Sequence, residues 1–305
     1  MPIYRGDTLI RELRKSKGLT LKELSEGICS LDSLSRIERG QRRPDWYIFE
    51  RLMQRLGENP RKYYSDVATA EEKKIIDQKD AITELLRKKT AEGDEQARRM
   101  VARLETDGNY KEGINRQFLL RARSILAFHE KHYQSMYDYA AEGLKITIPE
   151  FDEEKIDTYA LSFDEIKLVN QIAVARNFLT SMEKSTEILL KLKSAVDKGY
   201  ADGEEKAKTY ISLLYNITKN LGLLKKHDEA IALCDDGIAL CQKHRDSFYH
   251  PLFLINKGSG FIFLDKKAEG AGMLKTARSL LRGFNRLSEL ETLENYANTE
   301  FGIKL

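Results

Sequence analysis

The stretch at residues 18–40, GLTLKELSEGICSLDSLSRIERG, constrains the fold of this chain more than any other. Thr20 is a good N-cap, and Glu23 three residues later completes a capping box. A short helix should therefore begin at Leu21 and turn its apolar side chains toward a core.

A second short helix follows after a tight turn. Ser30 can cap it, and Leu34 and Ile37, three residues apart, lie on its inner face. Gly40 should end this helix, and Pro44 beyond it can start a helix but not continue one. Two helices of about two turns each, joined by a tight turn, match the helix-turn-helix plan, whose second helix enters the major groove of DNA.

The apolar positions of this region predict a small helical core, and the polar positions predict its surface. The residues expected in the core are Leu9, Leu13, Leu24, Ile28, Leu34, Ile37, Leu52 and Leu56. The residues expected on the outer face of the second helix are Asp32, Ser33, Ser35 and Arg36.

The region resembles the repressor-type helix-turn-helix family, with residues 9–17 as its first helix and 46–56 as its fourth. The run SRIERG at residues 35–40 is the most specific part of the match. The resemblance implies an ion pair between Arg14 and Glu38 that ties the first helix to the recognition helix. The resemblance also implies base contacts from Leu31, Asp32, Ser33 and Arg36, and phosphate contacts from Thr20, Lys22, Arg39, Gln41, Arg42 and Arg43. The alternative for Arg36 is that it is only a surface charge and contacts no base.

The length of the chain requires more than this head. A domain of this kind needs only about 65 of the 305 residues, so a larger domain should follow. We expect a DNA-binding domain at 1–66, a linker at 67–74 and a second domain at 75–305. Residues 1–66 carry 14 Lys and Arg against 10 Asp and Glu, a net charge of +4 that suits phosphate binding, whereas the remainder carries −1.

Several classes of protein are disfavoured by composition. No segment approaches the roughly 18 unbroken apolar residues of a membrane span, and the start MPIYRGD lacks a signal peptide's apolar core, so we expect a cytoplasmic protein. Cys29, Cys234 and Cys241 show neither a disulfide framework nor a paired metal spacing. We expect no metal and no cofactor.

An enzymatic interpretation receives little support. The run HEKH at residues 129–132 looks briefly like a zinc-protease motif, but that chemistry needs two His four residues apart and here the gap is three. No Gly-rich phosphate loop or nucleophile elbow appears either. We therefore expect a protein that is not an enzyme.

The rest of the chain predicts helix after helix, with strand alternation nearly absent. Helical hairpins that recur every 34 to 45 residues or so indicate an α-solenoid. The fold class we predict is all-α: an N-terminal helix-turn-helix domain followed by a right-handed, tetratricopeptide-like α-solenoid. The expected helices lie at 70–91, 95–106, 114–131, 134–145, 162–179, 184–198, 203–223, 227–244, 251–264, 268–282 and 287–301.

The clearest repeat unit runs from 214 to 237, and a second at 254–277 repeats its arrangement forty residues later. Small residues such as Cys234, Gly237 and Gly270 mark the second helix of each pair for close packing. The pattern resembles a degenerate tetratricopeptide repeat, whose first helices line a concave, peptide-binding side. The residues expected to contact a peptide there are Asn170, Arg176, Asn177, Tyr215, Asn216, Lys219, Asn220, Asn256 and Phe263. An Asn amide can both donate to and accept from a peptide backbone, although some of these amides could instead cross-link neighbouring helices.

Head, linker and solenoid together resemble the RRNPP family of peptide-pheromone regulators, in particular its PlcR-like and Rgg-like members. The resemblance implies a homodimeric transcription regulator of quorum sensing that binds a palindromic double-stranded DNA operator. It also implies that a short signalling peptide binds the solenoid and changes the spacing of the two heads. Two alternatives remain: a phage-type or antitoxin-like repressor whose solenoid binds a partner protein, or a solenoid that serves only as a dimerisation scaffold.

Overall fold

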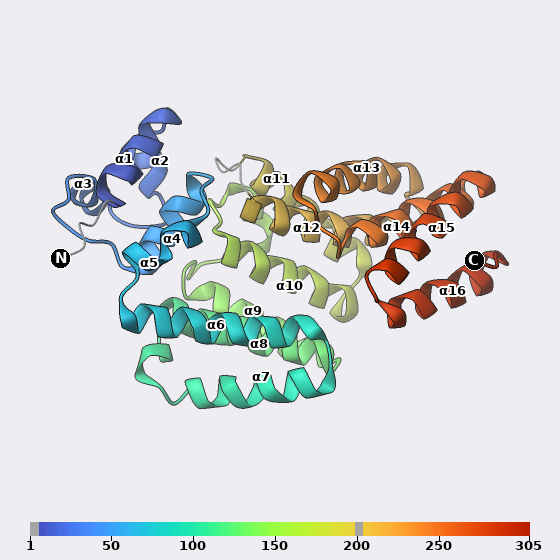
Figure 1. The fold of residues 1–305 in the computed structure, drawn as a ribbon, viewed down its shortest axis with the longest axis horizontal. Coiled ribbons are helices and arrows are strands. Elements are labelled where there is room, and N and C mark those ends of the chain that lie inside the picture. Colours follow the sequence, from blue (N-terminus) through green and yellow to red (C-terminus); the bar gives the residue numbers. More distant parts are fainter. Residues whose placement is uncertain (1–5, 199–203) are drawn as a thin grey trace. The chain divides into compact units, whose positions relative to one another are not determined.

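The structure, a computed structural model, describes residues 6–198 and 204–305 (Figure 1). Within these ranges the secondary structure consists of α-helices α1 to α16 and three short 3-10 helices, with no strand. The all-α prediction is confirmed, and the body after the head is built from successive helical hairpins.

The first four helices form the head. They are α1 (Gly6–Ser16), α2 (Leu21–Ser25), α3 (Leu31–Glu38) and α4 (Trp46–Arg55), followed by η1 (Pro60–Tyr63) and α5 (Tyr64–Val67). The expected caps are present: the Thr20 hydroxyl accepts from the Glu23 N–H at 3.2 Å, and the Thr20 N–H donates to the Glu23 carboxylate at 2.7 Å. Ser30 caps α3 through the Ser33 N–H at 3.1 Å.

Gly40 ends α3 as the sequence predicts. Its φ of +69° lies in the left-handed region, which costs a glycine nothing in steric strain. The Gly40 N–H donates to the Ile37 carbonyl at 3.0 Å, and the Gln41 N–H donates to the Arg36 carbonyl at 2.9 Å. This pair of bonds is a Schellman motif, and it turns the chain sharply away from α3.

The body follows the expected order of helices closely. Their bounds are α6 (Ala70–Lys88), α7 (Ala91–Leu104), η2 (Gly108–Tyr110), α8 (Gly113–His129), α9 (Tyr133–Lys145), η3 (Glu153–Thr158), α10 (Phe163–Leu179), α11 (Met182–Lys198), α12 (Glu204–Leu223), α13 (His227–His244), α14 (His250–Phe263), α15 (Lys267–Gly283) and α16 (Leu287–Phe301). Residue 203, expected as the start of one helix, lies outside the described residues.

Five turns between body helices in the described ranges share one backbone closure. Lys131, Lys225, Arg245, Asp265 and Asn285 all have φ between 54° and 62°, although none is glycine. At each turn two successive N–H groups donate back to carbonyls of the preceding helix, as Lys225 does to Gly222 at 3.1 Å and Lys226 to Leu221 at 2.9 Å. The recurrence of this Schellman closure supports the repeat interpretation from backbone geometry.

The described chain divides into two compact units, each with its own core. Unit 1 comprises residues 1–180 and 194–206, and unit 2 comprises 181–193 and 207–305. In unit 1, the head core contains most of the apolar residues expected there, and it also contains Val67, Ala68 and Ile76. The stretch expected as a linker at 67–74 is therefore packed, because it supplies side chains to the head core and most of it is the first turn of α6.

Glycines set the closest helix contacts of unit 2. A Cβ added to Gly270 on α15 would lie 2.5 Å from the Gly258 carbonyl oxygen on α14, and one added to Gly237 on α13 would lie 2.4 Å from the Phe253 ring. The small residues of the predicted repeat thus lie where helices meet. Cys234 and Cys241 are also buried there, and burial raises the pKa of both thiols to about 12.

Candidate nucleic-acid interface

A bidentate ion pair joins α1 to α3. Arg14 Nε lies 2.6 Å from Glu38 Oε1, and Arg14 Nη2 lies 2.8 Å from Glu38 Oε2. Arg14 Nη1 also donates to the Leu19 carbonyl at 2.9 Å, and the hydrogen bond to Glu38 raises the Arg14 pKa. Both side chains are largely withdrawn from solvent, so this pair positions α3 and does not itself face a ligand.

Three of the four residues expected to read bases face solvent on α3. Leu31 is 51% exposed, and the side chains of Asp32 and Arg36 are 67% and 58% exposed. Arg36 Nε lies 3.0 Å from Asp32 Oδ2, one helical turn apart. The expectation for Ser33 is wrong about its place on the outer face: it is only 5% exposed, because it lies on the side of α3 that packs into the head.

All six residues expected to contact phosphates are exposed. Arg39 folds back on its own helix, donating to the Ser35 hydroxyl at 2.7 Å, and Arg42 Nη1 donates to the Ser33 hydroxyl at 2.9 Å. In this structure the Ser33 hydroxyl therefore orients an arginine. The exposed members of the set are Thr20, Lys22, Arg39, Gln41, Arg42 and Arg43.

Arg43 has a second set of contacts that the sequence does not reveal. Its Nη2 donates to the Val67 carbonyl and lies 3.8 Å from Glu72 Oε2. Glu72 closes the capping box of α6 with Thr69 and also accepts from the Trp46 N–H at 2.7 Å. Arg43 thus helps hold the head to α6, which differs from its expected role as a free phosphate contact.

A further link in unit 1 connects α4 to α10. Arg51 Nη2 lies 3.3 Å from Glu165 Oε2, and both side chains are almost completely buried. Arg51 Nη1 donates to the Tyr47 hydroxyl at 2.7 Å, and burial raises the Tyr47 pKa to about 12. No local pattern predicts this pair, because its members are 114 residues apart in the sequence.

Glu50, next to that link, has a strongly perturbed carboxyl. Burial and the negative charge of Asp164 raise its pKa from 4.5 to about 7, against the opposing influence of Lys79, Arg61 and Lys167. These groups line a polar cavity of about 530 Å³ in unit 1. The folded chain therefore disfavours ionisation of Glu50 relative to a solvent-exposed glutamate.

The residues expected to bind a peptide fall in both units. In unit 1, Arg176 Nη2 bonds to Glu153 Oε1 at 2.9 Å and to the Tyr137 hydroxyl at 3.0 Å, and its guanidinium lies 4.4 Å from the Tyr137 ring centre. This guanidinium is tied to α9 and η3. Asn170 and Asn177, on the same helix, are half-buried and have partners.

In unit 2, two of the amides cross-link neighbouring helices. Asn220 is only 3% exposed and donates to the Ser185 hydroxyl at 3.1 Å, so its expected role as a peptide contact is wrong for this state. Asn256 donates to the Thr218 hydroxyl at 3.1 Å. The reason is that a buried amide must be hydrogen-bonded, and the nearest polar groups are on adjacent helices.

The other expected peptide contacts of unit 2 retain more accessible surface. Phe263 is 54% exposed, with its ring stacked on that of His227 at 4.9 Å between centres. Lys219 is exposed, and Asn216 is half-buried with a partner. Tyr215 is half-buried against Tyr249 and Phe253.

The HEKH run ends α8 and begins the turn to α9. His129 Nδ1 lies 2.8 Å from Asp94 Oδ1 on α7, and His132 Nδ1 lies 3.3 Å from Glu130. No group of three potential metal ligands occurs among the described residues. No helix within the described ranges is both long and apolar enough to cross a membrane.

Comparisons with known proteins agree with this architecture. Residues 8–61 match a family described as a helix-turn-helix domain. No curated protein sequence matches the chain. Bacillus thuringiensis PlcR, in complex with the peptide PapR7 and DNA, is similar in structure with a TM-score of 0.61 and 18% identity, over 96% of this chain and 99% of PlcR.

Two further structures are similar over nearly their whole length. ComR from S. thermophilus, in complex with DNA and its signalling peptide ComS, has a TM-score of 0.54 and 13% identity, over 94% of this chain and 97% of ComR. The SHP pheromone receptor Rgg2 from Streptococcus dysgalactiae has a TM-score of 0.51 and 12% identity, over 97% of this chain and 100% of Rgg2. The chain therefore carries a helix-turn-helix domain at residues 8–61 and shares the fold of PlcR, ComR and Rgg2.

Proposed function

We propose that the chain is a sequence-specific, DNA-binding transcription regulator whose α3 enters the major groove. The observation that carries this proposal is the exposed face of α3 in a helix-turn-helix domain, with Leu31, Asp32 and Arg36 directed outward and basic residues beside them. The net charge of +4 on residues 1–66 favours approach to phosphates.

Arg36 is the best placed of these residues to read a base. A guanidinium can bond the N7 and O6 of guanine with two N–H groups. Its present partner, Asp32, is exposed, and an exposed ion pair contributes only about 0–1 kcal/mol. Exchanging Asp32 for a guanine edge therefore costs little.

We further propose that the protein acts as a homodimer that binds a short signalling peptide through its helical repeats. The likeness of fold to PlcR and ComR, whose structures contain both a peptide and DNA, supports this proposal. Tyr215, Lys219 and Phe263 of unit 2 are the accessible candidates for contacts to peptide side chains. A peptide that prefers one conformation shifts the protein toward it only by its difference in affinity, about 1.4 kcal/mol per tenfold.

The DNA proposal is tested by selecting operators from a random duplex library and measuring affinity by fluorescence anisotropy. Arg36→Ala should weaken binding to the selected operator at least about tenfold, while Arg11→Ala, an equal loss of charge on the exposed side of α1, should have a much smaller effect. Affinity should fall steeply with salt, because neutralised phosphates release counterions. Equal affinities for the two variants would remove Arg36 from the readers, and a flat salt response would contradict DNA binding by the head.

The dimer and peptide proposals need separate measurements. Light scattering should give twice the chain mass of 35.1 kDa, and a monomer at micromolar concentration would contradict the homodimer. Affinity selection from a library of synthetic heptapeptides should retain apolar or acidic peptides, and Lys219→Ala with Phe263→Ala should release them. Retention unchanged by these two substitutions would place the ligand elsewhere.

A further inference from the structure

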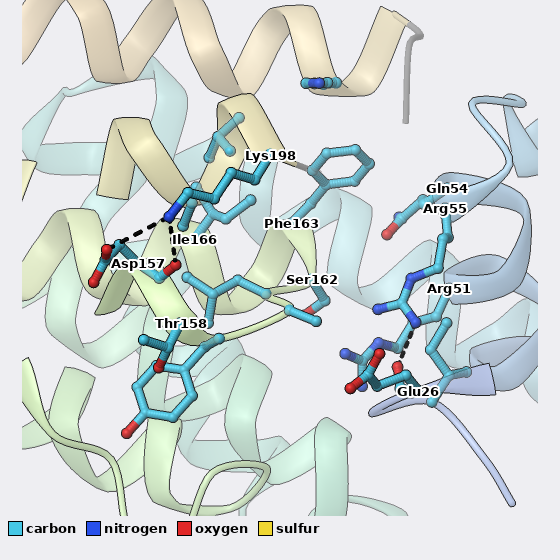
Figure 2. Close-up of a pocket in the computed structure, with 17 residues that line it drawn as sticks. Glu26, Arg51, Gln54, Arg55, Asp157, Thr158, Ser162, Phe163, Ile166 and Lys198 are labelled. Carbon is cyan, nitrogen blue, oxygen red and sulfur yellow. Dashed lines mark hydrogen bonds and ion pairs between the residues drawn. The ribbon is translucent and has the colours of Figure 1, made fainter. Parts of the chain in front are cut away.

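Unit 1 contains a cavity of about 270 Å³ between the head and the segment that leads into α10 (Figure 2). Arg51, Arg55 and Ile28 line it from the head. Phe163 and Lys198 line it from the body. None of the residues expected to contact DNA or peptide contributes to its walls, so neither proposed activity accounts for it.

The apolar part of the wall could hold a hydrocarbon group. Ile28 is half-buried, whereas Phe163, Ile166 and Val196 are buried. These four side chains are apolar and present no hydrogen-bonding group to a ligand. At about 30 Å³ for each water, the cavity holds about nine waters, close to the volume of a ligand of about ten non-hydrogen atoms.

The charged part of the wall is cationic. Four cations line the cavity, Arg51, Arg55, Lys198 and Lys206, against two carboxylates, Glu26 and Asp157. Some of this charge is already satisfied within the protein. Arg55 donates to backbone carbonyls at the end of α2, including those of Glu23 and Leu24 at 3.3 Å. Lys198 lies 3.5 Å from Asp157 Oδ2.

Arg51 is different, because it is buried and incompletely bonded. Its residue surface is 6% exposed, and its Nε has no hydrogen-bond partner among the described residues. Its bond to Glu165 is long at 3.3 Å, whereas a charge-assisted N–H···O⁻ bond is usually about 2.7–2.9 Å. A buried N–H without an acceptor is costly, so an added anionic acceptor would be favoured here.

We propose that this cavity binds a small amphipathic carboxylate, with its hydrocarbon against Phe163 and Ile166 and its carboxylate toward Arg51. Such a ligand would contact α4 and the turn that follows α2 in the head, together with the start of α10. It would therefore stabilise the packing of the head on that part of unit 1, since a ligand that binds only the folded state stabilises it. The proposal does not depend on DNA or peptide binding.

The test uses phenylacetate as the probe and its neutral counterpart phenylacetamide as the matched control, at constant ionic strength and without DNA. For a ligand of this size we expect phenylacetate to bind with a Kd of about 1 mM. Phenylacetamide should bind at least about tenfold more weakly, because it cannot form the charge-assisted bond. Binding is followed by heteronuclear NMR of the full chain, in which the amides of Ala160 and Leu161 should shift.

Three variants locate the site. Ala160→Phe, at an exposed position in the lining, should block the cavity, and Arg51→Gln should remove the preference for the carboxylate. Arg11→Gln, far from the lining in sequence and exposed, should leave binding unchanged. If Arg51→Gln proves unfolded by circular dichroism, Lys198→Gln replaces it, since that position is exposed, and it should weaken phenylacetate about threefold or more.

Three results would each overturn the proposal. The first is the absence of saturable phenylacetate shifts up to about 10 mM. The second is equal binding of phenylacetate and phenylacetamide, and the third is binding that persists unchanged in Ala160→Phe. Because no DNA is present, any of these failures leaves the proposed regulatory function untouched.

Discussion

The contact between α14 and α15 permits a sharp test of the repeat packing. Gly270 and Gly258 face each other where these helices cross, and a methyl group on Gly270 would lie 2.5 Å from both the Gly258 carbonyl oxygen and Ile262 Cγ1. One of these obstacles is backbone, so the helices themselves must separate. We expect Gly270→Ala to force that separation and destabilise unit 2.

The magnitude follows from two opposed effects. Overpacking a close contact costs about 1–3 kcal/mol, and a clash with backbone at this distance belongs at the upper end. Replacing a helical glycine by alanine recovers about 1 kcal/mol of helix propensity. The net change should therefore be a destabilisation of about 2 kcal/mol, which is a factor of about 30 in the folding equilibrium.

Gly272, on the same helix, is the matched control. An added Cβ there meets nothing within 4 Å, so Gly272→Ala should stabilise the protein by about 0.5–1 kcal/mol through propensity alone. Urea unfolding followed by circular dichroism at 222 nm measures both variants. If Gly270→Ala were as stable as Gly272→Ala, the close approach of α14 and α15 would be refuted.

Three other substitutions test particular contacts. Glu50→Gln should flatten the pH dependence of stability between pH 4.5 and 7. Because the Glu50 pKa is raised in the folded state, the favourable contribution of the protonated carboxyl to stability is full below pH 4.5 and is lost as the pH rises to about 7. Above that pH the variant should therefore be more stable than the parent by up to about 3 kcal/mol in urea unfolding. An unchanged pH profile of stability would contradict the raised pKa. Arg14→Lys cannot keep both hydrogen bonds to Glu38, so it should lower the free energy of unfolding by about 1–3 kcal/mol. An unchanged free energy of unfolding would show that the bidentate pair does not stabilise the head. Lys225→Gly should raise the melting temperature slightly, since a left-handed lysine costs about 1–2 kcal/mol, whereas Lys226→Gly, at negative φ, should not.

Much of the fold could be predicted from the sequence, because local patterns decide it. The capping box at Thr20, the glycine stop at Gly40 and the periodicity of the body helices all report on nearby residues. The Schellman turns at Lys131 and Lys225 could not be predicted, because lysine rarely adopts positive φ and only the packed helix pair imposes it.

The candidate site was predictable only where a residue's role depends on its own helix. Arg36 is exposed on α3 as expected from spacing, and Leu31 is exposed as the family resemblance implies. Ser33, Arg43 and Asn220 differ because each is bound by a group distant in sequence or on another element, and no local pattern encodes those partners. Arg51 was missed for the same reason, since its partner lies on α10.

The burial of Val67, Ala68 and Ile76 in the head core has a practical consequence for cutting the protein. A fragment that ended at residue 66 would lack these three core side chains, and the apolar surface that they cover would be exposed to water. One that continues to Lys88, the last residue of α6, retains these side chains and a complete helix. The first body helix is also packed rigidly into the head core, so a rotation of α6 would rotate the exposed face of α3 with it.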